Sequence, residues 1–305
     1  MPPELLLDAR ADLGEGPAWD ARSNCLYWVD IHAGHLHAFD PVGKTDRCLD
    51  LGEFIGCAVP RQAGGLVLAL RSGFATLDSD SPPLAEHPRR GQQGEGLVVR
   101  GIVNPEAHLP GNRFNDGKCD PAGRLLAGTM DDAEEAASGS LYSLSIDRSL
   151  QTLLTGVRIS NGLTWSPDAR TFYYIDTPAR QVTAFDYDLA SGAIANPRPA
   201  ITVPPEMGWP DGMTSDTEGM LWVAIWGGAR LTRWDPATAQ LLESIPFPAL
   251  NVSSCAFGGP HLDELYVTSA RKGMGAAQLD QYPLSGSLFR LRPGVQGMPT
   301  FAFGG

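Results

Sequence analysis

Four polar residues occupy equivalent positions in repeated segments of the chain: Glu15, Asn115, Asn161 and Asp211. Each stands five residues before a turn that leads into a short apolar strand. Two weaker copies of the segment place Gly56 and Ser254 at the same position. If the fold brings the four polar side chains together, two carboxylates and two amide oxygens converge, and they repel one another unless a cation lies between them. All-oxygen ligation suits Ca²⁺, Mg²⁺ or Mn²⁺ better than a structural zinc ion.

Three of these residues also lie in sequences that favour tight turns without any ligand. Asp211 lies between a proline and a glycine, Asn161 precedes a glycine, and Asn115 begins Asn-Asp-Gly. Glu15 is not a turn former, and all four share one repeat position, so the pattern favours a metal site over four unrelated turns. At the mouth of a channel, part of the coordination sphere would stay open to water or substrate, as in a catalytic metal site.

The spacing of the repeats predicts the elements that must position these side chains. The six equivalent residues are separated by 41 to 59 residues, close to the roughly 40–50-residue period of propeller blades. Each unit contains several short strands broken by Gly, Pro, Asp and Asn, without a convincing helical period. Stacking such sheets around an axis buries both faces of each sheet and lines a channel with the innermost strands. We therefore expect an all-β, six-bladed β-propeller that forms a single domain over residues 1–305.

Closure of such a ring needs contact between the two ends of the chain. The apolar run at residues 5–7 precedes the first turn signals, and residues 287–291 form a candidate strand near the other end. We expect the N-terminal run to be the outer strand of the last blade, paired with the C-terminal one.

Charge and composition argue against several classes of partner. A formal net charge of −12 disfavours nucleic acid and anionic membranes, and no apolar run approaches the ~18 residues that span a bilayer. The N-terminal residues lack the basic region and long apolar run of a signal peptide. Five cysteines, without Cys-x-x-Cys spacing, predict reduced, buried thiols and no disulfide framework. We expect a cytoplasmic protein that is a monomer or a weak homodimer.

Three other segments each allow two interpretations. His32, His35 and His37 alternate around a turn, and because no further ligand is evident nearby, a solvated hairpin is favoured over a metal site. Residues 79–112 form the longest irregular stretch, either a mobile loop that helps to cover a pocket or a spacer. The acidic run at 131–135 is favoured as a solvated loop, with a rim that touches a substrate as the alternative.

The chain resembles the senescence marker protein/gluconolactonase/regucalcin family of sugar-lactone hydrolases over nearly its whole length. The resemblance rests on eight blocks in order: Leu13-Gly-Glu15-Gly-Pro17, Asn112-Arg-Phe-Asn115-Asp-Gly-Lys118, Ala127-Gly-Thr-Met130, Ile159-Ser-Asn161-Gly-Leu163, Pro210-Asp211-Gly-Met213, Gly219-Met-Leu-Trp-Val-Ala224, Cys255-Ala-Phe-Gly-Gly259 and Tyr266-Val-Thr-Ser-Ala-Arg271. That family consists of six-bladed propellers with one divalent metal ion in the channel.

By this resemblance, Glu15, Asn161 and Asp211 are expected to bind the metal ion, with Asp211 also acting as general base. The resemblance further implies that Arg113 and Asn115 hold the substrate's ring oxygens and hydroxyls. Some animal members carry a substrate-contacting Glu three residues after the methionine of the third block, where this chain has Ala133. We expect Asp132 to substitute for that residue.

The implied reaction is hydrolysis of a sugar (aldono) lactone to the aldonic acid, assisted by one divalent ion: Ca²⁺, Zn²⁺, Mg²⁺, Mn²⁺ or Fe²⁺. A small-molecule lactone is then the expected partner, with no nucleic acid and no membrane. Two alternatives stay open at this point. One is a calcium-binding or scaffolding propeller without enzymatic activity, because this architecture often only presents surfaces. The other is an esterase or phosphotriesterase that uses the same metal ion.

Overall fold

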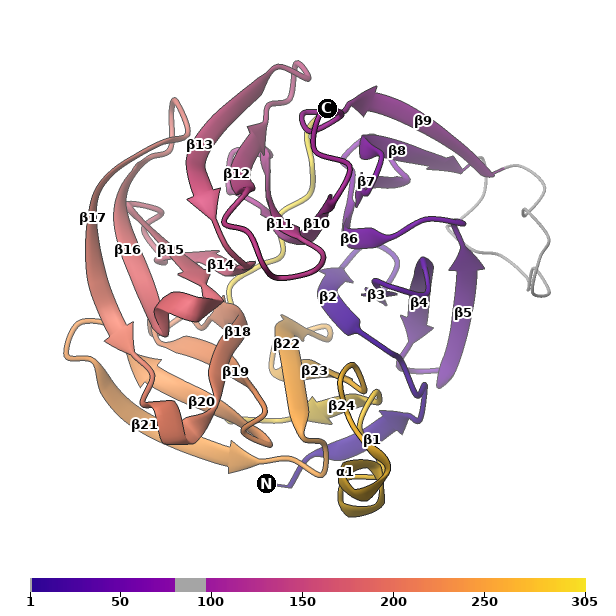
Figure 1. Cartoon of the computed structure of the whole chain (residues 1–305), viewed down its shortest axis with the longest axis vertical. Helices are drawn as coiled ribbons and strands as arrows, with labels where there is room; N and C mark the ends of the chain where they lie inside the picture. The colour runs from indigo at the N-terminus through magenta and orange to yellow at the C-terminus, as the bar shows by residue number, and fades with distance from the viewer. Residues whose placement is uncertain (1, 80–96) are drawn as a thin grey trace.

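The computed structural model describes residues 2–79 and 97–305, and in these residues six four-stranded antiparallel sheets surround a central axis (Figure 1). The first three sheets, from the axis outward, are β2 (Gly14–Asp20), β3 (Cys25–Asp30), β4 (His35–Asp40) and β5 (Thr45–Asp50); β6 (Ile55–Pro60), β7 (Leu66–Leu70), β8 (Gly73–Ser79) and β9 (Leu97–Val103); and β10 (Asn112–Cys119), β11 (Leu125–Asp131), β12 (Gly139–Leu144) and β13 (Leu150–Val157).

The remaining sheets are β14 (Ser160–Trp165), β15 (Thr171–Asp176), β16 (Gln181–Asp188) and β17 (Ala193–Thr202); β18 (Trp209–Ser215), β19 (Leu221–Trp226), β20 (Arg230–Asp235) and β21 (Gln240–Pro246); and β22 (Asn251–Gly258), β23 (Glu264–Ala270), β24 (Leu288–Leu291) and β1 (Glu4–Leu7). The protein is therefore an all-β, six-bladed propeller, as the repeat spacing predicts.

The N-terminal strand closes the ring. β1 pairs antiparallel with β24, with Glu4 opposite Arg290 and Leu5 opposite Phe289. Nη2 of Arg290 lies 2.7 Å from a carboxylate oxygen of Glu4, which adds an ion pair to the strand pairing. The last blade thus takes one strand from the start of the chain and three from its end, which confirms the predicted closure.

The core lies between neighbouring sheets, and β19 shows how one strand packs on both sides. Leu221, Val223 and Ile225 pack in a cluster with side chains of β15 and β16, while Trp222 and Ala224 pack with β22 and β23. This follows from the two-residue period of a strand, which sends alternate side chains to opposite faces. Truncation of a buried tryptophan typically costs about 3–5 kcal/mol, and Trp222 is 0% exposed.

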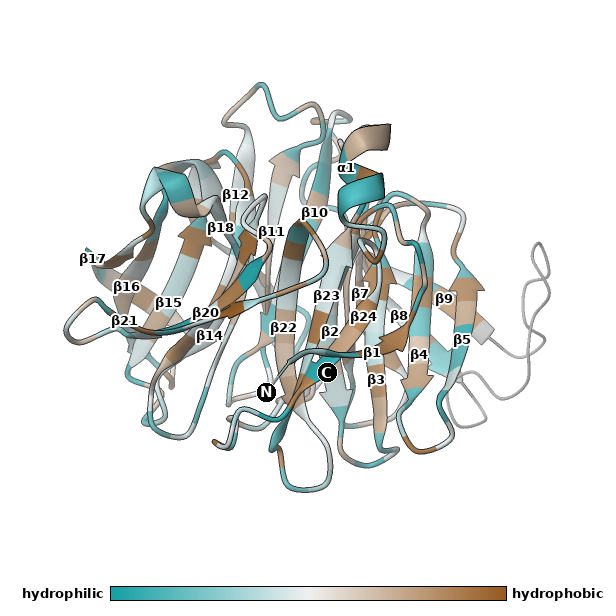
Figure 2. Ribbon diagram, turned by 90° about the horizontal axis from the view of Figure 1, so that it is seen from below, coloured by the Kyte–Doolittle hydropathy of each residue, from teal (hydrophilic) through white to brown (hydrophobic). Residues whose placement is uncertain are grey.

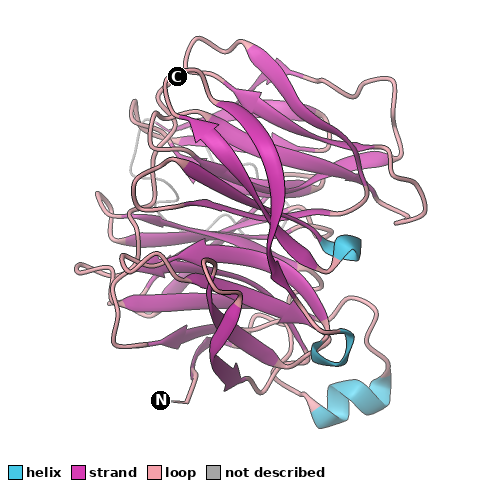
Figure 3. Ribbon diagram, turned by 90° about the vertical axis from the view of Figure 1, so that its left-hand side faces the viewer, coloured by secondary structure: helices cyan, strands magenta, loops and turns pink. Residues whose placement is uncertain are grey.

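Three short helices occur in the described residues, and the sequence did not predict them. They are the 3-10 turns η1 (Thr177–Ala179) and η2 (Pro205–Met207) and the helix α1 (Ala276–Gln281). Segments of three to six residues are too short to show a helical period in the sequence. Figures 2 and 3 show that the helices gather at one face of the ring, which is called the helical face below.

The predicted irregular stretch at 79–112 is only partly irregular. Residues 97–103 form β9, the outermost strand of the second sheet, which pairs with β8. The expectation of one long irregular stretch was therefore wrong for these residues. The run Leu97-Val-Val-Arg-Gly-Ile-Val103 is rich in β-branched residues that favour a strand, but it follows residues rich in Pro, Gly and Arg. Residues 80–96, where the mobile loop or spacer was expected, lie outside the described residues.

Within residues 2–79 and 97–305, no helix has the length and apolar character required to cross a bilayer. The five cysteines are free thiols. Cys57, Cys119 and Cys255 are buried as predicted, whereas Cys25 and Cys48 are half-buried.

Candidate active site and metal centre

A cavity of about 770 Å³, called the central cavity below, opens among the innermost strands and brings together five of the six residues singled out in the sequence. These are Glu15, Arg113, Asn115, Asn161 and Asp211. Thr177 and Pro178 of η1 and Gln278 of α1 also line this cavity, so it opens at the helical face. Residues that are nearly two hundred positions apart in the chain thus line one space.

A break in strand pairing occurs at or next to the repeat position in every innermost strand. The pairing register shifts between Glu15 and Ala18, Ile55 and Cys57, Phe114 and Asp116, Ser160 and Leu163, Pro210 and Met213, and Val252 and Ser254. Such bulges leave residues unpaired and re-aim their side chains, and they are enriched next to active sites. The repeat position therefore corresponds to a local distortion that turns side chains toward the channel.

Two of the six repeat positions place no side-chain oxygen in the central cavity. At Gly56, a Cβ atom would lie 2.6 Å from the carbonyl carbon of Phe114, so the close approach of β10 excludes any side chain there. Ser254 pairs with Thr268 and is not among the residues that line the central cavity, whereas Asn251, at the start of the same strand, is. The expected ring is thus open on the β6 and β22 sides.

A chain of hydrogen bonds orients the polar side chains. Arg113 donates from Nη1 to Oδ1 of Asn115 (2.5 Å), which leaves the amide nitrogen of Asn115 to donate to Oδ1 of Asn161 (2.9 Å). The nitrogen of Asn161 in turn donates to Oγ1 of Thr177 (2.8 Å), and Thr177 donates to the carbonyl oxygen of Pro210. Each amide is therefore held in one orientation, and the oxygen of Asn161 keeps a second lone pair for a ligand.

The buried carboxylates of Glu15 and Asp211 receive too few hydrogen bonds and positive charges from the protein to offset the cost of burying them. Burial, followed by the negative charges of Asp211 and Asp116, raises the pKa of Glu15 well above its usual range. Burial and Asp116 likewise raise the pKa of Asp211. Oδ1 of Asp211 is buried and has no hydrogen-bond partner among the described residues. A buried acceptor without a donor is costly and rare in folded proteins.

These observations fit a hard divalent cation. Two carboxylates and an oriented amide oxygen form an all-oxygen donor set, and a cation beside Oδ1 of Asp211 would satisfy the atom that the protein leaves without a donor. Glu15 Oε2 accepts only a 3.2 Å hydrogen bond from the amide of Gly16 among the described contacts, so it too has free acceptor capacity.

Asp132 differs from the other five predicted residues because it does not line the central cavity. Its Oδ1 accepts a 2.7 Å hydrogen bond from Nε of Arg113 and lies 3.3 Å from Nε2 of His32. Burial opposes ionisation of Asp132, but Arg113 outweighs it and lowers the pKa of the carboxyl group. In this arrangement Asp132 positions Arg113.

Sequence reasoning missed Lys272 and Trp209 at the mouth of the cavity, whereas Glu134 belongs to the acidic run at 131–135 for which a rim was the alternative to a solvated loop. Nζ of Lys272 lies 2.6 Å from Oε1 of Glu134, and both residues line the cavity although they are 138 positions apart. Trp209 also lines the cavity, and the guanidinium of Arg180 lies 3.4 Å from the centre of its ring. The position of Trp209, two residues before Asp211, was a signal available in the sequence. The partner of Lys272 was not.

The sequence profile of the SMP-30/gluconolactonase/LRE-like region matches residues 13–271. The chain belongs to this family. Regucalcin from Danio rerio is 38% identical over 307 residues, which cover 99% of this chain and 98% of that protein. A Bacillus subtilis family member provisionally named a sugar lactone lactonase is 38% identical over 303 residues, again 99% and 98% of the two chains.

A solved family structure has the same fold. The calcium-binding protein regucalcin from Agrobacterium tumefaciens superposes with a TM-score of 0.89 and 26% identity, covering 99% of this chain and 97% of that one. The family resemblance expected from the eight sequence blocks is thereby confirmed.

Proposed function

We propose that this protein is a metal-dependent lactonase that hydrolyses a sugar lactone to the open-chain aldonic acid. The observation that carries the proposal is the carboxylate of Asp211, buried in the central cavity beside Glu15 with one oxygen lacking a donor. A scaffold gains nothing from such an arrangement, because it destabilises the fold. Membership of a family that includes gluconolactonases supports the substrate class.

Glu15, Asn161 and Asp211 would hold one divalent ion. When bound, that ion supplies Lewis-acid polarisation of the lactone carbonyl and stabilises negative charge on its oxygen. Ca²⁺ is the first candidate because the Agrobacterium relative is described as calcium-binding, and Zn²⁺, Mg²⁺, Mn²⁺ and Fe²⁺ are to be compared with it.

Asp211 acts as general base in the proposed reaction. One carboxylate oxygen takes a proton from the attacking water, the C–O bond of the ring ester breaks, and the same carboxyl group returns the proton to the departing ring oxygen. The water oxygen bonds to the carbonyl carbon and becomes the hydroxyl oxygen of the new carboxylic acid, which keeps the second hydrogen of the water until it ionises. The hydrogen that passes through Asp211 ends on the new alcohol. Burial raises the pKa of Asp211 in the metal-free protein, and a divalent ion bound beside it would lower that pKa and keep the carboxylate ionised as a base.

Arg113 and Asn115 orient the substrate in this proposal. The hydrogen bonds described for Arg113 use Nε and Nη1, so Nη2 remains to donate to a sugar hydroxyl or ring oxygen. Trp209 and Trp226 line the cavity and offer apolar surface to the C–H faces of a sugar ring.

The main alternative is calcium binding without turnover, which the name of the Agrobacterium relative favours. A panel of aldonolactones, aryl esters and phosphotriesters, each assayed with chelator and then with each divalent ion, separates the possibilities. We expect lactones to be hydrolysed fastest and chelator to abolish the activity. Glu15→Gln should lose the activity as well, while Asp186→Asn, at an exposed carboxylate, should keep it. Failure to hydrolyse any lactone with any of the five ions would contradict the proposal.

A further inference from the structure

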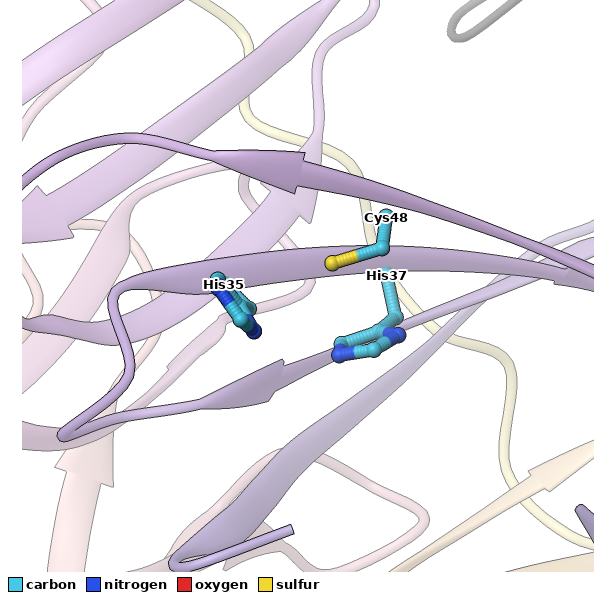
Figure 4. Close-up of side chains that lie close together, drawn as sticks. All are labelled: His35, His37 and Cys48. Carbon is cyan, nitrogen blue, oxygen red and sulfur yellow. The ribbon is translucent and has the colours of Figure 1, made fainter. Parts of the chain in front are cut away.

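A second group of metal-binding side chains lies in the first blade, away from the central cavity (Figure 4). His35 and His37 are on β4, and Cys48 is on β5. His37 is directly opposite Cys48 in the antiparallel pair, and His35 is two residues earlier on the same face. One ligand atom from each residue lies within 4.8 Å of the other two. None of the three lines the central cavity.

The cluster differs from the solvated hairpin expected from the sequence. His37 is buried, and His35 and Cys48 are half-buried. The imidazole of His37 stacks on the indole of Trp28, with ring centres 3.8 Å apart and planes inclined by 17°. The third ligand was not evident in the sequence because Cys48 is eleven residues after His37 and approaches it only through strand pairing.

Asp46 orients the buried histidine. Its Oδ2 lies 2.7 Å from Nδ1 of His37, and its side chain is itself largely buried. A proton on Nδ1 donates to this carboxylate, so Nε2 is the nitrogen left with a free lone pair. A carboxylate that holds the remote nitrogen of a histidine is the usual outer-sphere partner of a metal-ligating imidazole.

We propose that His35, His37 and Cys48 form a second metal site, which takes a transition-metal ion of the Zn²⁺ class with water as the fourth ligand. Two imidazoles and one thiolate match the preference of such ions, whereas Ca²⁺ and Mg²⁺ prefer oxygen. Tetrahedral ligation needs ligand separations of about 3.4–3.6 Å. In this proposal, small side-chain rotations of the half-buried His35 and Cys48 bring the ligand atoms from within 4.8 Å of one another to those separations.

The protein environment also favours the thiolate. Burial alone would raise the pKa of Cys48, but hydrogen bonds with His35 and His37 outweigh burial and lower the pKa to about 7. The thiolate is the form that binds metals, so this lowering favours ligation by Cys48. Burial alone would lower the pKa of His37, but hydrogen bonds with Asp46 and Cys48 outweigh burial and raise that pKa to about 9, so a bound ion must displace a proton from that imidazole. A bound ion would cross-link β4 and β5, the two outer strands of the first blade.

Co²⁺ titration of the full-length, metal-free protein tests this site separately from the central cavity. A thiolate bound to Co²⁺ gives a charge-transfer band in the near ultraviolet, which an all-oxygen site cannot give. We expect the intensity of the band at saturation to correspond to one thiolate-bound Co²⁺ per chain, because Co²⁺ in the all-oxygen central cavity adds no such band, and we expect the band to disappear when Zn²⁺ is added in excess. Absence of the band at saturating Co²⁺ would overturn the proposal.

Matched variants identify the ligands. Cys48→Ser should abolish the band, whereas Cys25→Ser, at the other half-buried cysteine of the same blade, should keep it. His35→Ala should also abolish the band, and Asp46→Asn should weaken Co²⁺ binding by about 10–100-fold. Circular dichroism spectra and melting temperatures verify that each variant folds. A band that survives in Cys48→Ser, or that disappears in Cys25→Ser, would exclude this ligand set.

The same variants test the second metal site independently of the proposed lactonase activity. Glu15→Gln should keep the charge-transfer band while losing lactone hydrolysis, and Cys48→Ser should keep lactone hydrolysis while losing the band. Loss of the band in Glu15→Gln would mean that Co²⁺ binds elsewhere and would overturn the second site.

Discussion

Two buried acids lie near opposite ends of the innermost strand β18, and they differ in their hydrogen bonds. Asp216, directly after the strand, is 0% exposed, and its Oδ2 accepts hydrogen bonds from Nε and Nη2 of Arg233 and from the indole of Trp222. Its Oδ1 accepts two backbone N–H groups. Five residues earlier, Asp211 is 4% exposed, yet its Oδ1 has no donor among the described residues.

The third blade has a donor-rich acid at the same position. Asp120 is fully buried, and it accepts hydrogen bonds from the backbone and Nε of Arg124 and from the hydroxyl of Tyr187. Asp120 and Asp216 therefore anchor the turns that lead into the second strands of their blades, β11 and β19. Burial by itself does not distinguish an anchoring carboxylate from a site carboxylate. The supply of donors does, because an unsatisfied buried charge is maintained only where a ligand completes it.

The largest effect is expected at the helical face. Asp211→Asn keeps the size of the side chain but removes its basicity, so lactone hydrolysis should fall by on the order of 10²–10⁴. The measurement is kcat/KM with the best lactone at saturating metal, with circular dichroism as the check on folding. A variant with wild-type rates would show that Asp211 is not the base and that the contrast between the two ends has no catalytic meaning.

At the end of β18 away from the helical face, we expect a loss of stability without a loss of activity. Asp216→Ala leaves Arg233 without its buried partner, so the free energy of unfolding should fall by about 3–5 kcal/mol, seen as a lower denaturation midpoint. The remaining contact of Arg233 with Glu218 limits the loss. The kcat of the folded fraction should not change. A large loss of kcat without a loss of stability would contradict the distinction between an anchoring Asp216 and a catalytic Asp211.

The third effect concerns the stability of the metal-free protein. Burial raises the pKa values of Glu15 and Asp211, whereas in the unfolded chain they titrate near their usual values of about 4. The folded state therefore keeps protons that the unfolded state has released, and stability should fall as pH rises from about 4 through the raised pKa values. Each unit of pKa shift corresponds to about 1.4 kcal/mol.

Urea midpoints at pH 5 and pH 8 in the presence of chelator measure this effect. Asp211→Asn should be more stable than wild type at pH 8 and should show a weaker pH dependence. Adding the divalent ion should restore the wild type at pH 8 but not the variant. Equal midpoints for wild type and variant at pH 8 would show that the buried carboxylate costs nothing.

The smallest effect is expected for the pair at the cavity mouth. The positive charge of Lys272 lowers the pKa of Asp211, so Lys272→Met should move the acidic limb of the kcat/KM profile to higher pH. The half-exposed pair with Glu134 contributes less than about 1 kcal/mol to stability, so the melting temperature should barely change. Glu134→Gln is the matched control, because it breaks the same pair while moving the limb the other way. A shift in the same direction for both variants would contradict this electrostatic account.

Much of the fold and part of the site could be predicted from the sequence. The turn signals before each apolar strand identified six units, and the five-residue offset singled out Glu15, Asn115, Asn161 and Asp211, which do line one cavity. The outer strand β9 was missed although its Val and Ile residues favour a strand, because it follows a stretch rich in Pro, Gly and Arg. Asp132 pairs with Arg113, which the sequence did not indicate because no local pattern encodes the partner of a charged side chain; its contact with the substrate stays a prediction.

The sequence by itself determined the number of blades, the closing strand and the position in each repeat where polar side chains recur, because strands and turns depend on neighbouring residues. Only the tertiary structure decided which of the buried acids receive donors. It also brought Cys48 to two histidines and Lys272 to Glu134. Bulges in the innermost strands and packing between blades set these contacts, and both depend on residues that are far apart along the chain.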